Sequence, residues 1–378
     1  MIEPKLRFKA DDGSQFPDWE EKTIDEVAEC LDNKRVPVNS EERKKRVGII
    51  PYYGAGGIQG YIDDYLFDEE LVLLLEDGDA FDDFQTKSIA QYITGKSWVN
   101  NHAHVLRANG NSYFLFASLE HKDIRRWTQL AGASRKKLLK DSMLKITVNI
   151  PSLPEQQKIA EFLSTVDTVI EKQKETVSAW EERKKGVMQK LFSQEVRFKA
   201  DNGSEFPEWE EKYLSDIASF HSGLTYTPDD VVDSENGILV FRSSNIQNGR
   251  IAYDDNVYVD KELKEKNYVK LHDIVVCVRN GSKSLVGKNA LVTESDLNAT
   301  WGAFMTVIRA KQNYEFIHQY LNSTFFKKEM YKDSGTATIN QITTAMLNDC
   351  KLFVPSIAEQ QKIADCLSSL YEVIEKQK

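Results

Sequence analysis

The sequence has no long apolar run, no closely paired cysteines and no strong catalytic signature. Its longest apolar clusters are short, such as LVLLL at 71–75, whereas a helix that spans a bilayer needs about 18 apolar residues or more. The opening residues, MIEPKLRFKADDG, lack the apolar stretch of a secretion signal. The cysteines show no CxxC spacing, which favours a reducing compartment and no zinc site: Cys30, Cys277, Cys350 and Cys366. We therefore expect a cytoplasmic protein that does not enter a membrane.

A basic surplus is also missing. The formal net charge is −10, yet residues 30–150 hold 17 basic and 16 acidic residues, and residues 220–350 hold 14 and 16. Most of the acidity therefore lies outside these two stretches. A near-neutral domain binds nucleic acid only where its cations gather on one face, so net charge gives no support for such binding.

Two segments of the chain each occur twice. RFKADDGSQFPDWEEKTIDEVAE at 7–29 returns at 197–219 with 14 of 23 positions identical, and PSLPEQQKIAEFLSTVDTVIEKQK at 151–174 returns at 355–378 with 16 of 24 identical. The stretches between them, 30–150 and 220–354, show no obvious similarity. A repeated frame that carries two different inserts indicates one scaffold presenting two different recognition domains.

The second repeat predicts long helices. From Pro154 apolar residues recur with alternating spacings of four and three, the pattern of a coiled coil, and Ser152 with Glu155 fits a capping box. The helix is expected to reach about Phe192, roughly 57 Å at 1.5 Å per residue, while its copy ends at Lys378 and looks truncated by comparison. We expect the two helices to pack antiparallel along a seam: Ile159, Leu163, Val166, Ile170 and Gln173 against Ile363, Leu367, Leu370, Ile374 and Gln377.

The inserts read as small α/β domains. Residues 46–116 and 238–309 contain short apolar runs separated by Gly- and Asn-rich turns, which predicts strands. A helical pattern follows in each, around 118–140 and 314–332.

Several partial matches to enzyme motifs are weak. YYGAG at 52–56 is similar to a loop that cradles S-adenosylmethionine, but no helix pattern follows it; IPYY at 50–53 uses the same residues and lacks the polar residue that a catalytic loop needs. GSKSLVGK at 281–288 has the wrong spacing for a phosphate loop. His102 and His104 share one face of a strand without further metal ligands at a recognisable spacing. We assign no catalytic residue and no metal ligand.

The remaining signal is a set of loops that mix Gly, Asn, Ser, aromatic and basic residues. Such side chains read base edges or hold phosphates, although Asn-Gly-Ser stretches are also ordinary turns. The candidate DNA-binding residues of the first insert are Tyr52, Tyr53, Gly54, Gln59, Lys96, Trp98, Asn100, Asn101, His102, Arg135 and Lys136. Those of the second are Arg242, Ser243, Ser244, Asn245, Arg279, Asn280, Ser282, Lys283, Thr336, Thr338, Asn340 and Gln341.

This layout resembles the specificity (S) subunit of bacterial type I restriction–modification enzymes. The resemblance rests on FPDWEEK and FPEWEEK, IPYYGAGGIQGYID, GKSWVNNHAHVL, LVFRSSNIQNGRI, DIVVCVRNGSKSLVGKNAL and the doubled EQQKIA helix start. The short last helix and GASRKKL at 132–138 depart from the family pattern.

The resemblance implies an α/β (α+β) fold with a pseudo-two-fold internal repeat: target-recognition domains at 1–150 and 197–354, and spacer helices at 151–196 and 355–378 forming an antiparallel coiled coil. It implies a non-catalytic subunit that binds double-stranded DNA at a split asymmetric target and docks two methyltransferase subunits, to which restriction subunits can add. S-adenosylmethionine, ATP and Mg would then belong to the partners, and this chain would hold no cofactor. The alternative is a self-contained DNA methyltransferase or nuclease with its own cofactor loop at 52–56. A purely structural coiled-coil adaptor does not explain why the inserts differ while the frame repeats.

Overall fold

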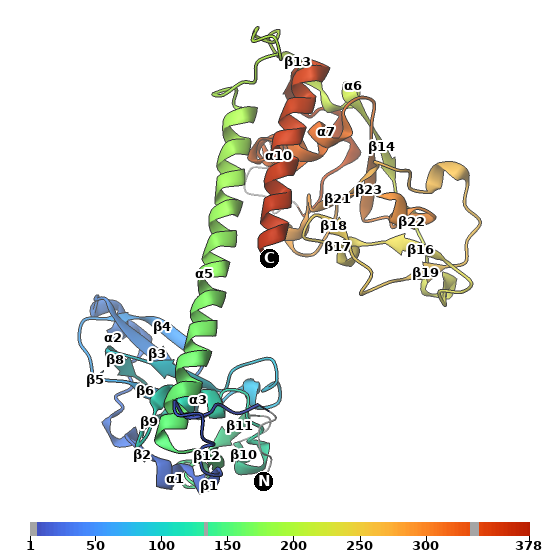
Figure 1. Cartoon of the computed structure of the whole chain (residues 1–378). Coiled ribbons are helices and arrows are strands. Elements are labelled where there is room, and N and C mark those ends of the chain that lie inside the picture. Colours follow the sequence, from blue (N-terminus) through green and yellow to red (C-terminus); the bar gives the residue numbers. More distant parts are fainter. Residues whose placement is uncertain (1–5, 132–134, 333–339) are drawn as a thin grey trace. The chain divides into compact units, whose positions relative to one another are not determined.

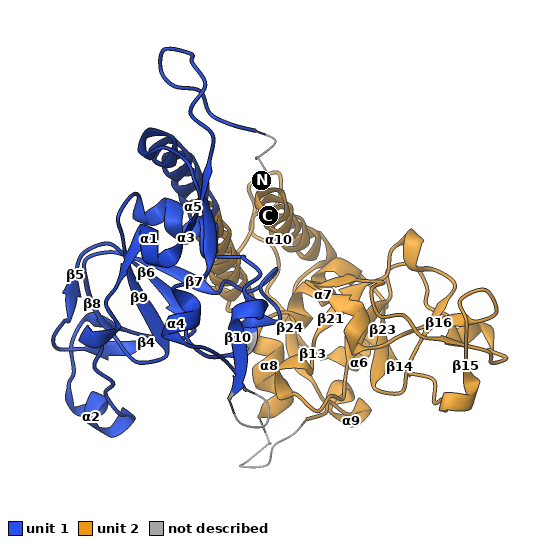
Figure 2. Ribbon diagram, turned by 90° about the horizontal axis from the view of Figure 1, so that it is seen from below, with its two compact units in different colours: residues 1–171 blue, residues 172–378 orange. Residues whose placement is uncertain are grey.

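The computed structural model describes residues 6–131, 135–332 and 340–378, and the chain divides into unit 1, residues 1–171, and unit 2, residues 172–378 (Figures 1 and 2). The boundary falls inside α5 (Leu153–Phe192), a continuous helix of 40 residues. The long helix predicted from Pro154 to Phe192 is therefore confirmed, and each unit holds part of it.

Unit 1 contains two four-stranded sheets and two short strand pairs. The first sheet has the order β2 (Ala28–Cys30), β9 (Ala103–Ala108), β6 (Leu71–Leu75), β7 (Ala90–Ile93), and the second β4 (Gly57–Ile62), β3 (Ile50–Gly54), β8 (Lys96–Val99), β5 (Phe67–Asp68). The pairs are β1 (Glu20–Thr23) with β12 (Thr147–Ile150) and β10 (Thr128–Ala131) with β11 (Arg135–Leu138). The helices besides α5 are α1 (Ile24–Val27), α2 (Ser40–Lys45), α3 (Ser112–Leu119) and α4 (Lys140–Met143).

The described residues of unit 2 also form two four-stranded sheets and two strand pairs. One sheet has the order β14 (Ala218–Ser222), β23 (Met305–Ala310), β20 (Ile274–Cys277), β21 (Asn289–Leu291), and the other β15 (Val231–Val232), β19 (Tyr258–Val259), β16 (Ile238–Phe241), β22 (Ala299–Trp301). Its pairs are β13 (Glu210–Tyr213) with β24 (Lys351–Val354) and β17 (Ile246–Gln247) with β18 (Arg250–Ile251). Its helices are α6 (Leu214–Ile217), α7 (Tyr314–Leu321), α8 (Thr324–Tyr331), α9 (Thr344–Asn348) and α10 (Ile357–Gln377).

The two inserts share one fold despite their dissimilar sequences. In each unit the central strand, β6 or β20, pairs antiparallel on both sides, and a parallel pair, β3 with β8 or β16 with β22, forms part of the second sheet. The register makes residues equivalent: Leu75 pairs with Ala103 as Cys277 pairs with Met305, and Tyr52 pairs with Trp98 as Phe241 pairs with Trp301.

The central strands are apolar throughout because both of their faces are buried. In β6, Val72 and Leu74 face one core cluster, while Leu71 and Leu73 face another. Side chains alternate along a strand, so a run such as LVLLL is what a strand between two cores requires. β20 follows the same rule.

The EQQK segment explains why the frame repeats. Glu155, fully buried, takes a two-point hydrogen bond from Arg7 at 3.1 and 2.8 Å, and Glu359 does the same with Arg197 at 3.2 and 2.9 Å. The next residue, Gln156 or Gln360, donates to the carbonyl of a proline five residues earlier at 2.9 Å. Lysines in the fourth position pair with aspartates of the opening repeat. These three contacts therefore join the repeated segments in the same way in both units, although Glu359 also accepts from the Trp209 indole at 3.1 Å.

Two predicted features are wrong. Of the helical patterns, 314–332 is confirmed by α7 and α8, but 118–140 holds the end of α3 followed by the β10–β11 hairpin. The capping box at the start of α5 is absent: the Ser152 hydroxyl has no hydrogen-bond partner among the described residues, and the Glu155 side chain is taken by Arg7.

The predicted register of the helix seam is also wrong. Ile363 and Leu367 pack in one core with Met188, Leu191 and Phe192, so α10 meets the last turns of α5 within unit 2. The partners expected for α10 lie in unit 1: Ile159, Leu163, Val166 and Ile170. Gln173 and Gln377 do meet, with Gln173 Nε2 donating to the Gln377 side-chain oxygen at 2.8 Å.

Candidate nucleic-acid interface

The same segments follow the central strands in both units. Arg279 and Asp77 are equivalent, because each lies two residues beyond the end of its central strand. Each also forms an isolated antiparallel bridge to a later segment, Arg279 to Gln341 and Asp77 to Lys137. Thus the loops at 279–283 and at 77–79 lie beside the segments at 340–342 and 135–138.

In unit 2, Arg279 is held with its guanidinium exposed. Its Nε and Nη2 atoms both donate to Oε1 of Gln341, at 3.0 and 2.7 Å, and the group lies 5.7 Å from the centre of the Phe304 ring. No carboxylate of the described residues forms an ion pair with it. The Arg279 guanidinium is therefore held in one orientation and has no carboxylate partner among the described residues. A guanidinium of this kind can pair with guanine or with phosphate.

Asn280 brings further candidates to the same place. Its side-chain nitrogen donates to the Ser243 hydroxyl at 3.0 Å, and its oxygen accepts from the Ser282 amide at 2.9 Å. Asn340 donates to the carbonyl of Gly281 at 3.2 Å. Five predicted residues, Ser243, Arg279, Asn280, Asn340 and Gln341, thus form one surface, which we name the unit 2 cluster.

The other predicted residues of unit 2 lie outside this cluster, and some of them hold the surrounding loops in place. Asn245 is completely buried and donates to the carbonyls of Ala252 and Asp255, and Arg242 forms an ion pair with Asp255 at 2.7 Å. The hydroxyls of Ser282 and Ser284 are bonded to each other, and the Lys283 ammonium is exposed near the Tyr331 ring. Ser244 lies in the turn before β17. Thr336 and Thr338 lie outside the described residues.

In unit 1, Tyr52 and Trp98 are core residues rather than contacts. The Tyr52 hydroxyl bonds to the backbone of Val38, and the Trp98 indole donates to the carbonyl of Val36 at 2.7 Å. Arg43 and Arg46 stack on these two rings, at 4.6 and 4.5 Å from the ring centres.

Four basic residues at the end of α2, which we name the α2 cations, were not among the predicted DNA-binding residues. Arg43, Lys44, Lys45 and Arg46 form the run RKKR, which by itself signals a basic patch. It was overlooked because the domain is neutral overall.

The β3–β4 hairpin and the loop after β8 carry the polar candidates of unit 1. Asn100 donates to Oε1 of Gln59 at 3.3 Å and accepts from the His102 amide at 2.8 Å. The Gln59 side chain lies so close to Gly54 that a Cβ there would come within 2.1 Å of it, so any other residue at position 54 would displace the Gln59 amide. Asn101 is exposed beside this group, Tyr53 is half-buried in β3, and Lys96 is exposed near the Tyr65 ring.

The loop after β6 is acidic and is neutralised from within unit 1. His102 Nδ1 lies 3.0 Å from Asp77, and Lys137 pairs with Glu76 at 3.0 Å. Lys136 pairs with Asp82. The Arg135 side chain lies outside the described residues.

Asp32, Glu76 and His104 come close enough to hold a metal ion, with ligand atoms within 4.8 Å of one another. Arg35 already supplies a cation there, at 3.2 Å from Asp32 and 2.6 Å from Glu76. The pKa of Asp32 is lowered: burial acts to raise it, but the His104 hydrogen bond and the nearby cations outweigh that effect. Both ring nitrogens of His104 also have partners. The group is an internal ion-pair network.

The possible cofactor loop at 52–56 is a β-hairpin. β3 ends at Gly54 and β4 begins at Gly57, whereas a methyltransferase loop leads into a helix. This arrangement does not favour the self-contained methyltransferase. Residues 281–288 likewise lead into a strand, β21, rather than a helix. Among the described residues, no helix is both long and apolar enough to cross a membrane.

A family model described as the type I restriction modification DNA specificity domain matches residues 17–178 and again residues 207–378. The chain belongs to this family. The doubled match follows the two units of the specificity-domain chain, and the resemblance inferred from the sequence is confirmed.

Its relatives carry consistent names. A putative type I restriction enzyme specificity subunit of Haemophilus influenzae is 39% identical over 157 residues, which is 41% of this chain and 38% of that protein. The type I restriction enzyme MjaVIII specificity subunit of Methanocaldococcus jannaschii is 26% identical over 394 residues, covering 97% of this chain and 90% of the relative. The specificity-domain chain thus spans well under half of the first relative and most of the second.

Solved structures agree on the fold. The crystal structure of the S subunit of a type I restriction–modification system from M. genitalium covers 100% of this chain and 94% of its own, with a TM-score of 0.60 at 15% identity. At this identity the likeness shows a shared fold.

Proposed function

We propose that this chain is the DNA-recognition subunit of a type I restriction–modification complex, in which unit 1 and unit 2 each bind one half of a split target. One observation carries the proposal. A single fold occurs twice, and the two equivalent segments beside the central strand present different polar side chains in each copy. Two copies that bound the same half-site would have no need of different clusters.

The unit 2 cluster has the chemistry of direct base recognition. A guanidinium fork suits the two acceptors of guanine in the major groove, and Asn or Gln amides suit adenine. In unit 1, Asn101, Gln59 and His102 would supply amide and imidazole groups, and the α2 cations would contact phosphates. The two half-sites are therefore expected to differ in sequence.

The partners follow from what the frame offers. The repeated segments carry most of the acidic charge, which repels DNA and suits a protein partner. We infer that two methyltransferase subunits dock on this frame, one for each repeat, and that restriction subunits can join them. S-adenosylmethionine, ATP and Mg are then bound by those subunits, which also perform the chemistry.

The test is to compare DNA methylation in the host with and without this gene. The proposal predicts a bipartite methylated motif, with two specified runs separated by a fixed gap, that disappears with the gene. Methylation that persists unchanged without the gene would contradict it, as would methylation of DNA by the purified chain alone.

A further inference from the structure

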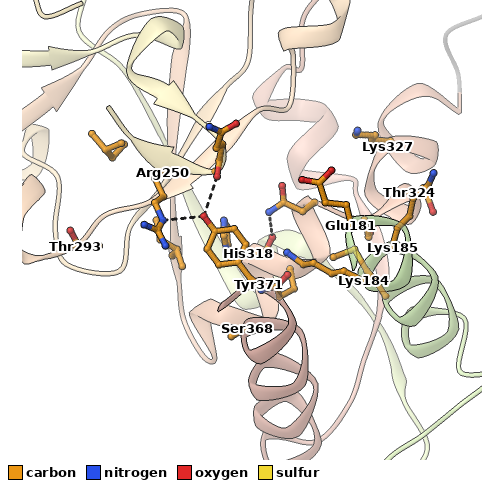
Figure 3. Close-up of a pocket in the computed structure, with 18 of the residues that line it drawn as sticks. Glu181, Lys184, Lys185, Arg250, Thr293, His318, Thr324, Lys327, Ser368 and Tyr371 are labelled. Atoms are coloured by element: carbon orange, nitrogen blue, oxygen red, sulfur yellow. Dashed lines mark hydrogen bonds between the residues drawn. The ribbon is translucent and has the colours of Figure 1, made fainter. Parts of the chain in front are cut away.

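Unit 2 contains a large cleft away from the unit 2 cluster. Its volume is about 850 Å³, within the usual range for small-molecule sites. The walls are the last third of α5, α7, the start of α8, the β17–β18 hairpin and α10 (Figure 3). None of the five residues of the unit 2 cluster lines it.

Two residues that line the cleft, His318 and Leu291, have aromatic residues at the equivalent positions of unit 1. α3 and α7 both have eight residues and an asparagine N-cap, so His318 occupies the position of Phe116. The strand register likewise places Leu291 where unit 1 has Tyr92. In unit 1, Tyr92, Tyr113 and Phe116 pack together with ring centres 5.1 to 6.3 Å apart. At these two positions unit 2 therefore has smaller side chains than unit 1.

His318 is a half-buried residue of the cleft lining, and its imidazole lacks one hydrogen-bond partner. Its Nε2 atom is closed off from solvent and has no hydrogen-bond partner among the described residues. Burial, aided by the nearby Lys184 ammonium, lowers the pKa of His318 to about 4. An unsatisfied polar group of this kind is costly to stability.

The charge left over around the cleft is positive. Lys184 lies against the Tyr371 ring at 4.9 Å (Figure 3), and burial lowers its pKa. Neither Lys184 nor Lys327 forms an ion pair with a carboxylate of the described residues. The acidic residues are already engaged: Asp296 accepts from Tyr253 and Thr293, and Glu181 pairs with Lys378 at 3.6 Å.

The first turn of α8 opens onto the same space. Ser323 caps the helix, and Thr324 and Lys327 line the cleft. The first amides of a helix lack intrahelical partners and favour an anion. Met188, Leu291 and Tyr371 form an apolar part of the lining beside these polar groups.

We propose that this cleft binds a small phosphorylated molecule of about nucleotide size. Lys184, Lys327 and the first turn of α8 hold the phosphate, while His318 and the apolar lining contact the rest of the molecule.

The test is titration calorimetry of the full chain with three probes: AMP, inorganic phosphate and adenosine. AMP should bind, phosphate should bind more weakly, and adenosine should not bind. Lys327→Ala should weaken AMP binding by about tenfold or more, because it removes one charge-assisted contact. Lys328→Ala is the matched control, since Lys328 is the next residue of α8 but does not line the cleft, and it should bind as the unaltered chain does.

His318→Phe installs the residue that unit 1 has at this position and should abolish AMP binding while the unfolding temperature is kept. Absence of binding by both AMP and phosphate at millimolar concentration would overturn the proposal. Equal binding of adenosine and AMP, or undiminished binding by Lys327→Ala, would overturn it as well.

Discussion

Arg279 shows how one side chain is prepared for recognition. A free arginine loses side-chain entropy when it binds, but the Gln341 amide and the Phe304 ring already fix the direction of this guanidinium. Gln341 therefore acts as a positioning residue, and Arg279 is the group expected to touch a base.

Replacing Arg279 by alanine should cost about 1–3 kcal/mol of discrimination at one base pair of the unit 2 half-site. Arg279→Lys should not restore it, because lysine lacks the planar fork. Lys283→Ala is the control: if this lysine contacts phosphate, its loss should weaken binding to all sequences alike and reduce the salt dependence. Binding of the assembled complex to a panel of single-base target variants distinguishes these patterns, and equal weakening on every base by Arg279→Ala would place Arg279 on phosphate instead.

His318 should also make stability depend on pH. Its pKa is about 4 in the folded chain and 6.5 ordinarily, so between these values the unfolded chain binds a proton that the folded chain does not. The stabilisation is complete above pH 6.5 and is lost as the pH falls toward 4, amounting to about 1–2 kcal/mol between pH 7 and 5. Urea unfolding at both pH values should show a smaller loss for His318→Phe than for the unaltered chain. The same loss in both proteins would contradict the burial of a neutral imidazole.

Residue types were predicted better than residue positions. Ser243, Asn280, Asn340 and Gln341 lie together as the polar loops indicated, yet Tyr52, Trp98 and Asn245 are buried. A sequence shows that an aromatic or amide group is present in a loop, but not whether the loop turns it inward. Asp77 was missed because only the strand register reveals that it is equivalent to Arg279.

At the scale of elements, the helix starts depend on partners far away in the chain. Arg7 and Glu155 are 148 residues apart, and Arg197 and Glu359 are 162 apart. The local sequence predicted where α5 and α10 begin. Glu155, which was expected to cap α5, instead accepts hydrogen bonds from Arg7 of the opening repeat.

Glu359→Gln should destabilise unit 2 by about 2–3 kcal/mol, because it leaves Arg197 without its buried counter-charge; the figure is below that for a fully buried pair since Arg197 is partly exposed. Lys362→Ala is the matched control, as its partner Asp201 lies at the surface, and it should leave the unfolding midpoint almost unchanged. Thermal unfolding of the two variants compares them directly. If Glu359→Gln kept the unfolding midpoint of the unaltered chain as well as Lys362→Ala does, the contact between Arg197 and Glu359 would not be important for stability.

The register of the helix pair could not be read from periodicity. A seam that repeats every seven residues is compatible with several alignments, and the tertiary connections select one. β13 follows the end of α5, and β24, which pairs with β13, leads directly into α10. α10 therefore starts near the end of α5 and runs back along its last turns.

For the whole molecule, the continuity of α5 across the boundary between the units has a consequence for the target. Four residues inserted between Glu171 and Lys172 lengthen the helix by about 6 Å, roughly two base pairs at 3.4 Å each. If α5 sets the gap between half-sites, the assembled complex should methylate targets with a changed spacer and unchanged half-sites. An active variant that keeps the original spacer would leave α5 as a scaffold only.

The modular use of two units is the central claim, and exchanging one insert tests it most directly. Residues 30–150 would be replaced by the corresponding insert of a relative with a different target, and the methylated motif would be determined by sequencing the host DNA. We expect one half-site to change to that of the donor, while the other half-site and the complex's activity are kept. A motif in which both half-sites change, or neither does, would contradict it.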